Sequence, residues 1–176
     1  VGVRQDTKEA IECFKKAIAP GVERPVNIAY ANLASLYFMG LHLPRNLNDA
    51  GYWAEQGDRV GEVNSTLTLS SILAIGSSNY PVDKPRAFQL AQKAYDTGSV
   101  AAKTTLGWYY LDGIGTPVNH GMAFKLLSEA AERGNASAYV FLARIYLDGL
   151  GIAKDPAKAR ESLQLASTQK NSLGPG

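Results

Sequence analysis

Glycines recur through this chain at nearly constant intervals, and this periodicity limits the folds that the chain can adopt. Successive members of one series are 36, 37 and 36 residues apart, and members of a second are 40, 37 and 36 apart. The first series is Gly40, Gly76, Gly113 and Gly149. The second series is Gly21, Gly61, Gly98 and Gly134. Self-similarity at this period is typical of stacked helical hairpins, so the sequence predicts a helical repeat array.

The first helix of each hairpin is indicated by three residues spaced four apart: a small residue, then Leu, then Tyr or Leu. Residues with this spacing share one face of an α-helix. We call the predicted segment the A helix. Its four copies are Ala29–Leu33–Tyr37, Ser65–Leu69–Leu73, Ala102–Leu106–Tyr110 and Ala138–Leu142–Tyr146.

The second helix of each hairpin, the B helix, is indicated by the alanines Ala10, Ala50, Ala87, Ala123 and Ala159. Four residues before each alanine stands an Asp or Asn: Asp6, Asn46, Asp83, Asn119 and Asp155. These residue types accept hydrogen bonds from the free N–H groups of a first helical turn. They recur once per repeat and are too scattered to share a metal ion, so we predict helix caps. The glycines should end helices, because glycine adopts the left-handed conformation at least cost.

These columns resemble the Sel-one-like repeat, a branch of the tetratricopeptide-like α-solenoids. The third copy fits the pattern best, with Ala102, Leu106-Gly107, Tyr110, Gly113, Gly115, Asn119, Ala123, Ala130-Ala131 and Gly134. The first full copy is degenerate, with His42 for the second glycine and Gly57 where the B helix should carry alanine. The resemblance implies an all-α fold, a right-handed α-solenoid of antiparallel helix pairs.

We expect a single repeat array over residues 1–176. It comprises a partial repeat at 6–21 (B helix only), repeats at 26–61, 62–98, 99–134 and 135–167, and a flexible tail at 168–176. The unpaired first B helix, at about residues 7–19, predicts either further repeats upstream or a homo-oligomer formed through this helix. Cys13 falls on the apolar face of that helix and is predicted to be buried.

Composition excludes several classes of function. A formal net charge of +2, without a Lys/Arg run, argues against nucleic-acid binding. No stretch is long and apolar enough to insert in a membrane. The one cysteine excludes a disulfide framework, and neither His42 nor His120 has a second ligand at suitable spacing, so we expect no metal or cofactor. By resemblance to bacterial relatives we favour an exported or periplasmic setting, with the cytoplasm left open.

By similarity to tetratricopeptide folds, A-helix positions near the Leu column should face a concave groove. The residues are Ala31, Ser35, Phe38, Leu67, Ser71, Thr104, Trp108, Val140 and Arg144. Such a surface suits an extended peptide or a helix. Our hypothesis is that Trp108 and Phe38 are apolar anchors and that Arg144 pairs with an acidic group of the partner. For Trp108, packing between adjacent A helices is an equally good interpretation.

The sequence therefore predicts a scaffold that binds a partner protein or peptide, as an adaptor, a regulator or a toxin-immunity protein of the bacterial envelope. An enzyme is a remote alternative, because the predicted groove offers one arginine and neither histidine nor carboxylate. A structural, self-associating oligomer is a further alternative.

Overall fold

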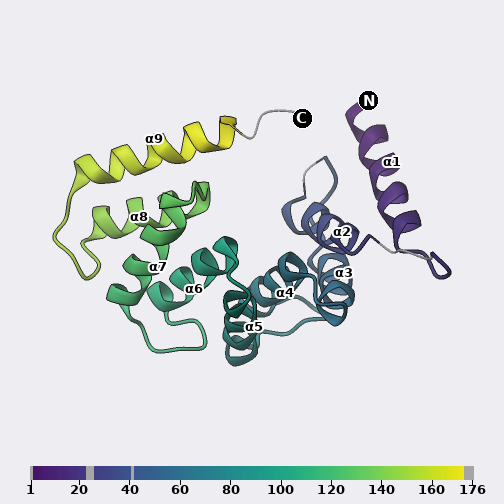
Figure 1. Ribbon diagram of the computed structural model, residues 1–176, viewed down its shortest axis with the longest axis horizontal. Coiled ribbons are helices and arrows are strands. Elements are labelled where there is room, and N and C mark those ends of the chain that lie inside the picture. The colour runs from purple at the N-terminus through teal and green to yellow at the C-terminus, as the bar shows by residue number, and fades with distance from the viewer. Residues whose placement is uncertain (1, 23–25, 41, 173–176) are drawn as a thin grey trace. The chain divides into compact units, whose positions relative to one another are not determined.

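The computed structural model describes residues 2–22, 26–40 and 42–172, and every regular element within these ranges is an α-helix. In chain order the helices are α1 (Gly2–Ala17), α2 (Ile28–Met39), α3 (Leu47–Arg59), α4 (Val63–Ile75), α5 (Lys84–Asp96), α6 (Val100–Asp112), α7 (His120–Glu132), α8 (Ala136–Asp148) and α9 (Pro156–Ser172) (Figure 1). The predicted all-α class of paired helices is confirmed. The A helices are α2, α4, α6 and α8, and the B helices are α1, α3, α5, α7 and α9.

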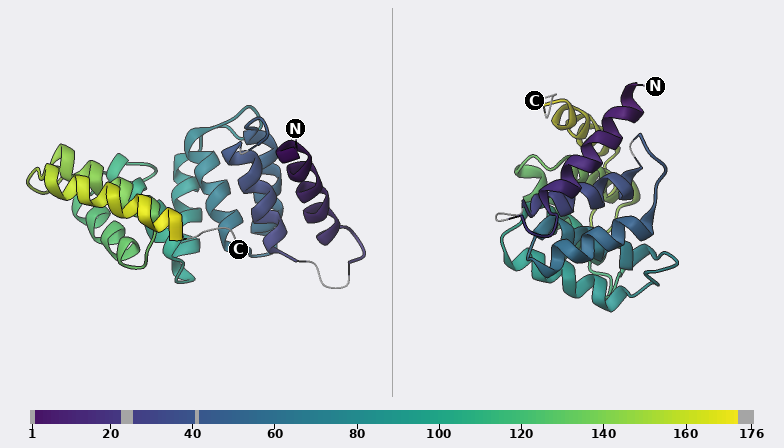
Figure 2. Two further views of the ribbon diagram at one scale, coloured as in Figure 1. Left: turned by 90° about the horizontal axis from the view of Figure 1, so that it is seen from above. Right: turned by 90° about the vertical axis from the view of Figure 1, so that its right-hand side faces the viewer.

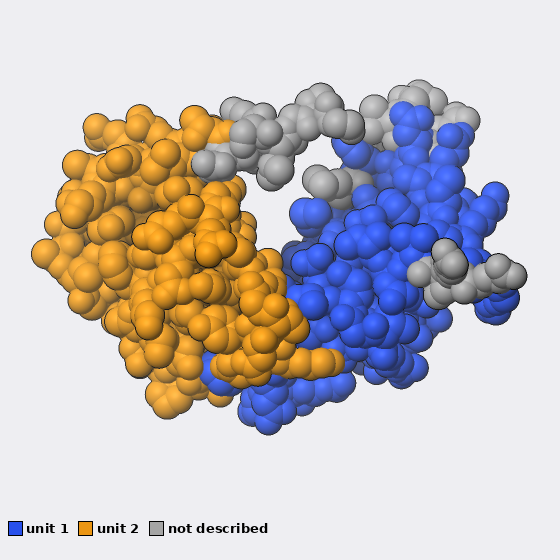
Figure 3. Space-filling model, in the orientation of Figure 1, with its two compact units in different colours: residues 1–90 blue, residues 91–176 orange. Residues whose placement is uncertain are grey.

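The chain forms two compact units, residues 1–90 and residues 91–176, and the boundary between them falls inside α5 (Figure 3). In unit 1, α1 packs on α2, α2 packs on α3 and α4, and α3 packs on α4 (Figure 2). In unit 2, α6 packs on α7 and α8, α7 packs on α8, and α8 packs on α9. Helices that adjoin in sequence therefore adjoin in space within each unit, as expected of stacked hairpins.

The cores of both units follow the predicted columns. Ala50, Ala87 and Ala123 are fully buried, as are Leu33 and Leu127. Small residues at these places let neighbouring helices approach closely, and the leucines fill the space between them. None of the described helices has the length and apolar character needed to cross a membrane.

Four of the five predicted caps at the starts of B helices are confirmed. In each, the side-chain oxygen accepts a hydrogen bond at 2.9–3.1 Å from a backbone N–H two or three residues later. The four are Asn46, Asp83, Asn119 and Asp155. Each such cap stabilises its helix by about 1 kcal/mol. The fifth prediction is wrong: Asp6 lies inside α1, which begins four residues earlier at Gly2, because residues 3–5 are all compatible with a helix.

The ends of the helices follow the glycine series. Gly40, Gly113 and Gly149 end α2, α6 and α8 in the left-handed conformation, with φ of 68° or 69°. The second glycine of the loop is also left-handed at Gly115 and Gly151, with φ of 69° and 72°. His42 takes the same conformation, with φ of 61°. The degenerate first repeat therefore keeps the backbone geometry of the pattern without its glycine, at the cost of strain.

Tyr80 supplies an aromatic side chain that α3 lacks. The residue that follows the B-helix alanine is Phe88 in α5 and Phe124 in α7, but it is Gly51 in α3. In its place the Tyr80 ring, from the loop between α4 and α5, lies directly over Gly51, and a Cβ there would overlap the ring. The Tyr80 hydroxyl donates to Glu55 Oε2 at 3.4 Å. The longer loop of this repeat thus compensates for the missing helix side chain.

A second compensation joins α3 to α4. Gly57 replaces the alanine found at Ala130, and Ser65 replaces the alanine found at Ala138. Both are buried, and a Cβ on Gly57 would overlap Ser65 Oγ and Cβ. Ser65 Oγ has no hydrogen-bond partner among the described residues. The larger residue on one helix is thus accommodated by the smaller residue on the other.

Two further predictions are corrected by the structure. Cys13 is exposed rather than buried, because α1 packs against α2 alone among the described helices and its opposite face is uncovered. Residues 168–172, predicted to belong to the tail, are the last turn of α9, and residues 173–176 lie outside the described ranges.

Candidate functional site

The predicted partner-binding residues divide into buried and accessible groups. Ala31, Leu67 and Thr104, each two residues before the Leu column, are 3%, 7% and 7% exposed. They cannot contact a partner while the helices stay packed, so these three predictions are wrong. The reason is that adjacent A helices contact each other directly, α2 with α4 and α6 with α8. Val140, at the same position of α8, is 51% exposed.

Apart from Val140, the accessible predicted residues lie two or more residues beyond the Leu column. Ser35, Phe38 and Ser71 in unit 1 are partly exposed, Trp108 in unit 2 is partly exposed, and Arg144 is exposed. Ser71 Oγ donates to the Leu67 carbonyl at 3.0 Å, so its hydroxyl is used within α4. The strongest cluster of accessible side chains is therefore the one around Trp108 and Arg144.

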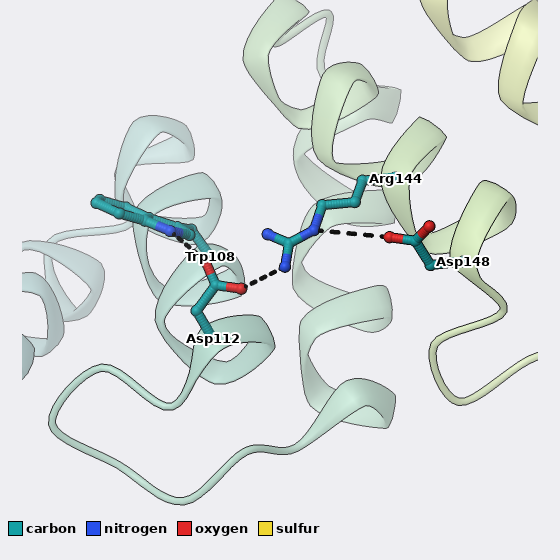
Figure 4. A network of polar contacts seen from close by, with 4 residues as sticks. All are labelled: Trp108, Asp112, Arg144 and Asp148. Carbon is teal, nitrogen blue, oxygen red and sulfur yellow. Dashed lines mark hydrogen bonds and ion pairs between the residues drawn. The ribbon is translucent and has the colours of Figure 1, made fainter.

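Trp108 and Arg144 are held by one carboxylate, that of Asp112 (Figure 4). Trp108 Nε1 donates to Asp112 Oδ2 at 2.7 Å, across one turn of α6. Arg144 Nη2, from α8, forms an ion pair with Asp112 Oδ1 at 2.8 Å. Both oxygens of Asp112 are thus engaged, and the carboxylate fixes an indole and a guanidinium on neighbouring A helices.

Asp148 completes this network from the end of α8. Its Oδ2 lies 3.9 Å from Arg144 Nε, and its side chain is 57% exposed. Arg144 is therefore not a free cation, because two carboxylates of its own unit stand beside it. The expectation that Arg144 pairs with an acidic group of a partner loses its main support.

Phe141 joins the same surface and was not predicted from the sequence. Its ring lies 6.3 Å from that of Trp108, with the planes only 17° apart, so the two rings are stacked with an offset. Such pairs contribute about 0.5–1.5 kcal/mol beyond their burial. Phe141 follows Val140 in the sequence, and this position next to a predicted contact residue is the feature from which it could have been predicted. We call Trp108, Asp112, Val140, Phe141, Arg144 and Asp148 the Trp108 surface.

In unit 1 the accessible A-helix side chains have a different character. The Arg45 guanidinium lies 5.2 Å from the centre of the Phe38 ring, and Arg45 Nε donates to the Phe38 carbonyl at 2.9 Å. One face of this predicted anchor is thus covered by its own loop. Met39 and Ile75, the last residues of α2 and α4, are exposed. Trp53 is partly buried, and its ring lies edge-on to that of Tyr52, with the ring centres 4.9 Å apart.

The groups with a shifted pKa lie outside the Trp108 surface in the part of the chain that the structure describes. Among the described residues no group of three His, Cys, Asp or Glu side chains could hold a metal ion. Hydrogen bonding to Lys103 lowers the pKa of Glu129, and burial beside Glu55 raises the pKa of Tyr80. Tyr80 lies in the loop between α4 and α5 and contacts Glu55 of α3, whereas the contact of Lys103 with Glu129 joins α6 to α7. Neither Tyr80 nor Glu129 belongs to the Trp108 surface. Both shifts are features of packing rather than a proton-transfer site.

Two surface cavities are lined by residues of both A and B helices. One, of about 290 Å³, is lined in unit 2 by residues of α7, α8 and α9 that include Tyr139, Tyr146 and Lys158. The other, of about 330 Å³, is lined in unit 1 by Glu55, Tyr80 and Arg86 among others. Among their described lining residues there is neither a histidine nor a cysteine.

The Sel1 repeat model matches the chain over residues 1–21, 27–57, 69–99, 101–135 and 136–171. The chain therefore belongs to the Sel1 repeat family, as the resemblance of its columns implied. Sel1 repeat proteins are generally scaffolds for protein–protein interactions and typically are not enzymes. No curated protein matches the sequence significantly.

Solved structures with the same repeat resemble this chain. A Sel1 repeat protein from Oxalobacter formigenes is 26% identical, with a TM-score of 0.59 over 81% of this chain and 41% of that one. The protein c5321, a protective antigen present in uropathogenic Escherichia coli strains and displaying an SLR fold, is 26% identical, with a TM-score of 0.64 over 93% of this chain and 34% of that one.

A Sel1 repeat protein from Klebsiella pneumoniae subsp. pneumoniae is 25% identical, with a TM-score of 0.68 over 81% of this chain and 68% of that one. This chain spans about two-fifths of the Oxalobacter protein and one-third of c5321. The similarity therefore extends to the repeat fold of longer proteins, and what those whole proteins bind is a separate question.

Proposed function

We propose that this chain is a non-enzymatic scaffold that binds a partner protein or peptide, with the Trp108 surface of unit 2 as its principal contact. The observation that carries the proposal is the fixed pair of Trp108 and Arg144, both held by Asp112 before any partner arrives. Tryptophan and arginine are enriched among residues that dominate binding energy. Prior fixation reduces the entropy lost on binding.

The geometry of the Trp108 surface supports a peptide-sized partner. Its side chains come from two adjacent helices, α6 and α8, which pack on each other. Val140 and the Trp108–Phe141 pair offer apolar area, while polar groups lie toward the helix ends. An apolar centre with a polar border is the usual organisation of a protein interface. In unit 1, Ser35, Phe38 and Ser71 are proposed as secondary contacts.

The biological role that we propose is that of an adaptor, a regulator or a toxin-immunity protein of a bacterial envelope. The support is that the similar structures come from bacteria and that one of them is a protective antigen. The small net charge of +2 supports a protein partner over a nucleic acid.

A test begins with peptides selected from a random displayed library on the purified chain. Affinity for a selected peptide should fall by about 1–3 kcal/mol in Trp108→Ala, the range for a truncated central aromatic residue. The matched control is Tyr52→Ala, which removes an exposed aromatic from α3, a B helix, and should leave affinity unchanged. Equal affinity of wild type and Trp108→Ala, with helicity intact, would remove the Trp108 surface from the binding site.

Self-association through α1 is a second candidate function. Among the described helices α1 packs against α2 alone, which leaves much of its surface accessible. Light scattering should then show a dimer that a charged substitution at the exposed Cys13, Cys13→Glu, converts to a monomer. A concentration-independent monomer for the wild-type chain would reject this candidate.

A further inference from the structure

The two carboxylates of the Trp108 surface lie at helix C-termini, where a negative charge destabilises the helix. Asp112 is the last residue of α6, and Asp148 is the last residue of α8. The C-terminal end of a helix carries partial negative charge, so an acidic side chain there is repelled rather than attracted. Two such placements on neighbouring helices concentrate negative potential at one edge of the surface.

The repeat fold itself does not demand these carboxylates. The equivalent last residues of the A helices in unit 1 are Met39 and Ile75, which are apolar and exposed. The same hairpin thus ends equally well with or without an acid at this position. Aspartates at both positions in unit 2 therefore need an explanation other than formation of the hairpin.

The charges of the Trp108 surface do not cancel. Arg144 is its one cation, against the two carboxylates of Asp112 and Asp148, which leaves a net charge of −1 beside two helix C-termini. Asp112 is occupied, since each of its oxygens already has a partner. Within the described part of the chain, the ion-pair contact of Asp148 is the long one of 3.9 Å to Arg144 Nε, and its side chain is 57% exposed.

Lys154, in the loop that follows α8, does not change this balance. The aliphatic part of Lys154 packs over Gly149, and no ion pair within 4 Å joins Lys154 to Asp148 among the described residues. Asp148 is therefore the group on this surface with most capacity to accept a further charged donor.

Beside the carboxylates lies an aromatic platform. The rings of Trp108 and Phe141 stack, and Val140, which precedes Phe141 in α8, is 51% exposed. The face of an aromatic ring attracts a cation, most strongly for tryptophan. A carboxylate next to an aromatic face suits a side chain that is both long and positively charged, with an apolar stem against the rings.

From this we infer that the Trp108 surface recognises a basic side chain, arginine or lysine, flanked by an apolar residue on a partner peptide. The inference rests on the proposed function and names the chemistry of its partner. Asp148 accepts the incoming cation, and the apolar neighbour lies on the platform of Trp108, Val140 and Phe141. Arg144 is a positioning residue, which holds Asp112 and with it the indole of Trp108.

Two synthetic peptides provide the test, acetyl-Gly-Leu-Arg-Leu-Gly-amide and its counterpart with Glu in place of Arg. Binding is followed by NMR of the ¹⁵N-labelled chain, with the Trp108 indole N–H as reporter. The other tryptophan, Trp53, is identified with the Trp53→Phe variant. The arginine peptide should shift the Trp108 indole signal and bind more tightly than the glutamate peptide, by a margin that shrinks as salt is added.

The decisive variant is Asp148→Asn. This substitution should lower the affinity of the chain for the arginine peptide by about 2–5-fold, the usual range for one exposed ion pair. Glu132→Gln is the matched control, because it removes the same charge from the last residue of α7, a B helix of the same unit. Asp148→Lys should reverse the preference between the two peptides.

The inference is overturned if the glutamate peptide binds as tightly as the arginine peptide, if Asp148→Asn has no effect, or if the arginine peptide leaves the Trp108 signal unmoved at its solubility limit. These failures are separable from failure of the proposed function. If library-selected peptides depend on Trp108 but neither contain basic residues nor respond to Asp148→Asn, the surface binds a partner of different chemistry. If they do not depend on Trp108, the proposed site itself is wrong.

Discussion

Substitution of Gly57 by alanine tests the packing that distinguishes the degenerate repeat. Gly57 lies inside α3, fully covered by α4 and α2, and a Cβ there would overlap Ser65 Oγ and Cβ and lie 2.9 Å from Tyr30 Cβ. The Cβ atoms of Ser65 and Tyr30 are fixed by the backbone and cannot rotate away, so the helices must separate. Inserting a methyl group into such a contact costs about 1–3 kcal/mol. The higher helix propensity of alanine offsets this cost by about 1 kcal/mol.

The net expectation for Gly57→Ala is a loss of up to about 2 kcal/mol in the free energy of unfolding. Urea unfolding, followed by far-ultraviolet circular dichroism, measures the loss as a lower midpoint. Gly121→Ala is the matched control. It lies in the first turn of α7 with only Asn119 Oδ1 near its Cβ position, at 3.6 Å, so it should be neutral or stabilising.

Ser65→Ala extends the test to a double-mutant cycle. Alone it should raise stability by about 1 kcal/mol, because it removes a buried hydroxyl that has no partner among the described residues. In the Ser65→Ala background, Gly57→Ala should lower the free energy of unfolding by less than in wild type, since the overlap with Ser65 Oγ disappears. Strict additivity of the two changes, or a stabilising Gly57→Ala in the wild-type background, would refute the argument that these residues compensate for each other.

Three further predictions concern other parts of the chain. His42→Gly should raise the free energy of unfolding by about 0.5–1 kcal/mol in the same urea assay, because it relieves a left-handed residue; a loss of stability would contradict this. Because the pKa of Tyr80 is raised, the stability it contributes is complete below pH 10 and is lost as pH rises through its folded pKa, so the midpoint for Tyr80→Phe should vary less with alkaline pH than that of wild type. Hydrogen bonding to Lys103 lowers the pKa of Glu129, so the stability that Glu129 contributes is present above pH 4.5 and is lost as pH falls through the depressed pKa. The free energy of unfolding of Glu129→Gln should therefore be lower than that of wild type at neutral pH and equal to it in strong acid.

Local patterns in the sequence predicted the helices well because their causes are local. An Asn or Asp cap acts on the N–H groups two or three residues later, so Asn46 and Asn119 could be assigned without the fold. Asp6 failed because the same residue type is also tolerated within a helix. The caps Glu62, Ser99 and Asn135 of the A helices were missed, since their residue types vary between repeats.

Contacts between helices were harder to predict from one sequence. Burial of Leu67 and Thr104 depends on how closely neighbouring A helices pack, which helical periodicity does not give. The Tyr80 contact with Gly51 spans 29 residues and follows from the course of a loop. The role of Asp112 depends on Arg144 reaching it from the next A helix. Trp108 and Arg144 were nevertheless predicted as contact residues, because the repeat register placed them in one column.

The most direct test of the binding account is chemical-shift mapping of a library-selected peptide on the backbone amides of the chain. The largest changes should fall in α6 and α8, around Trp108, Phe141 and Arg144. Changes concentrated on the B helices α7 and α9, with those A-helix signals unmoved, would contradict the binding account.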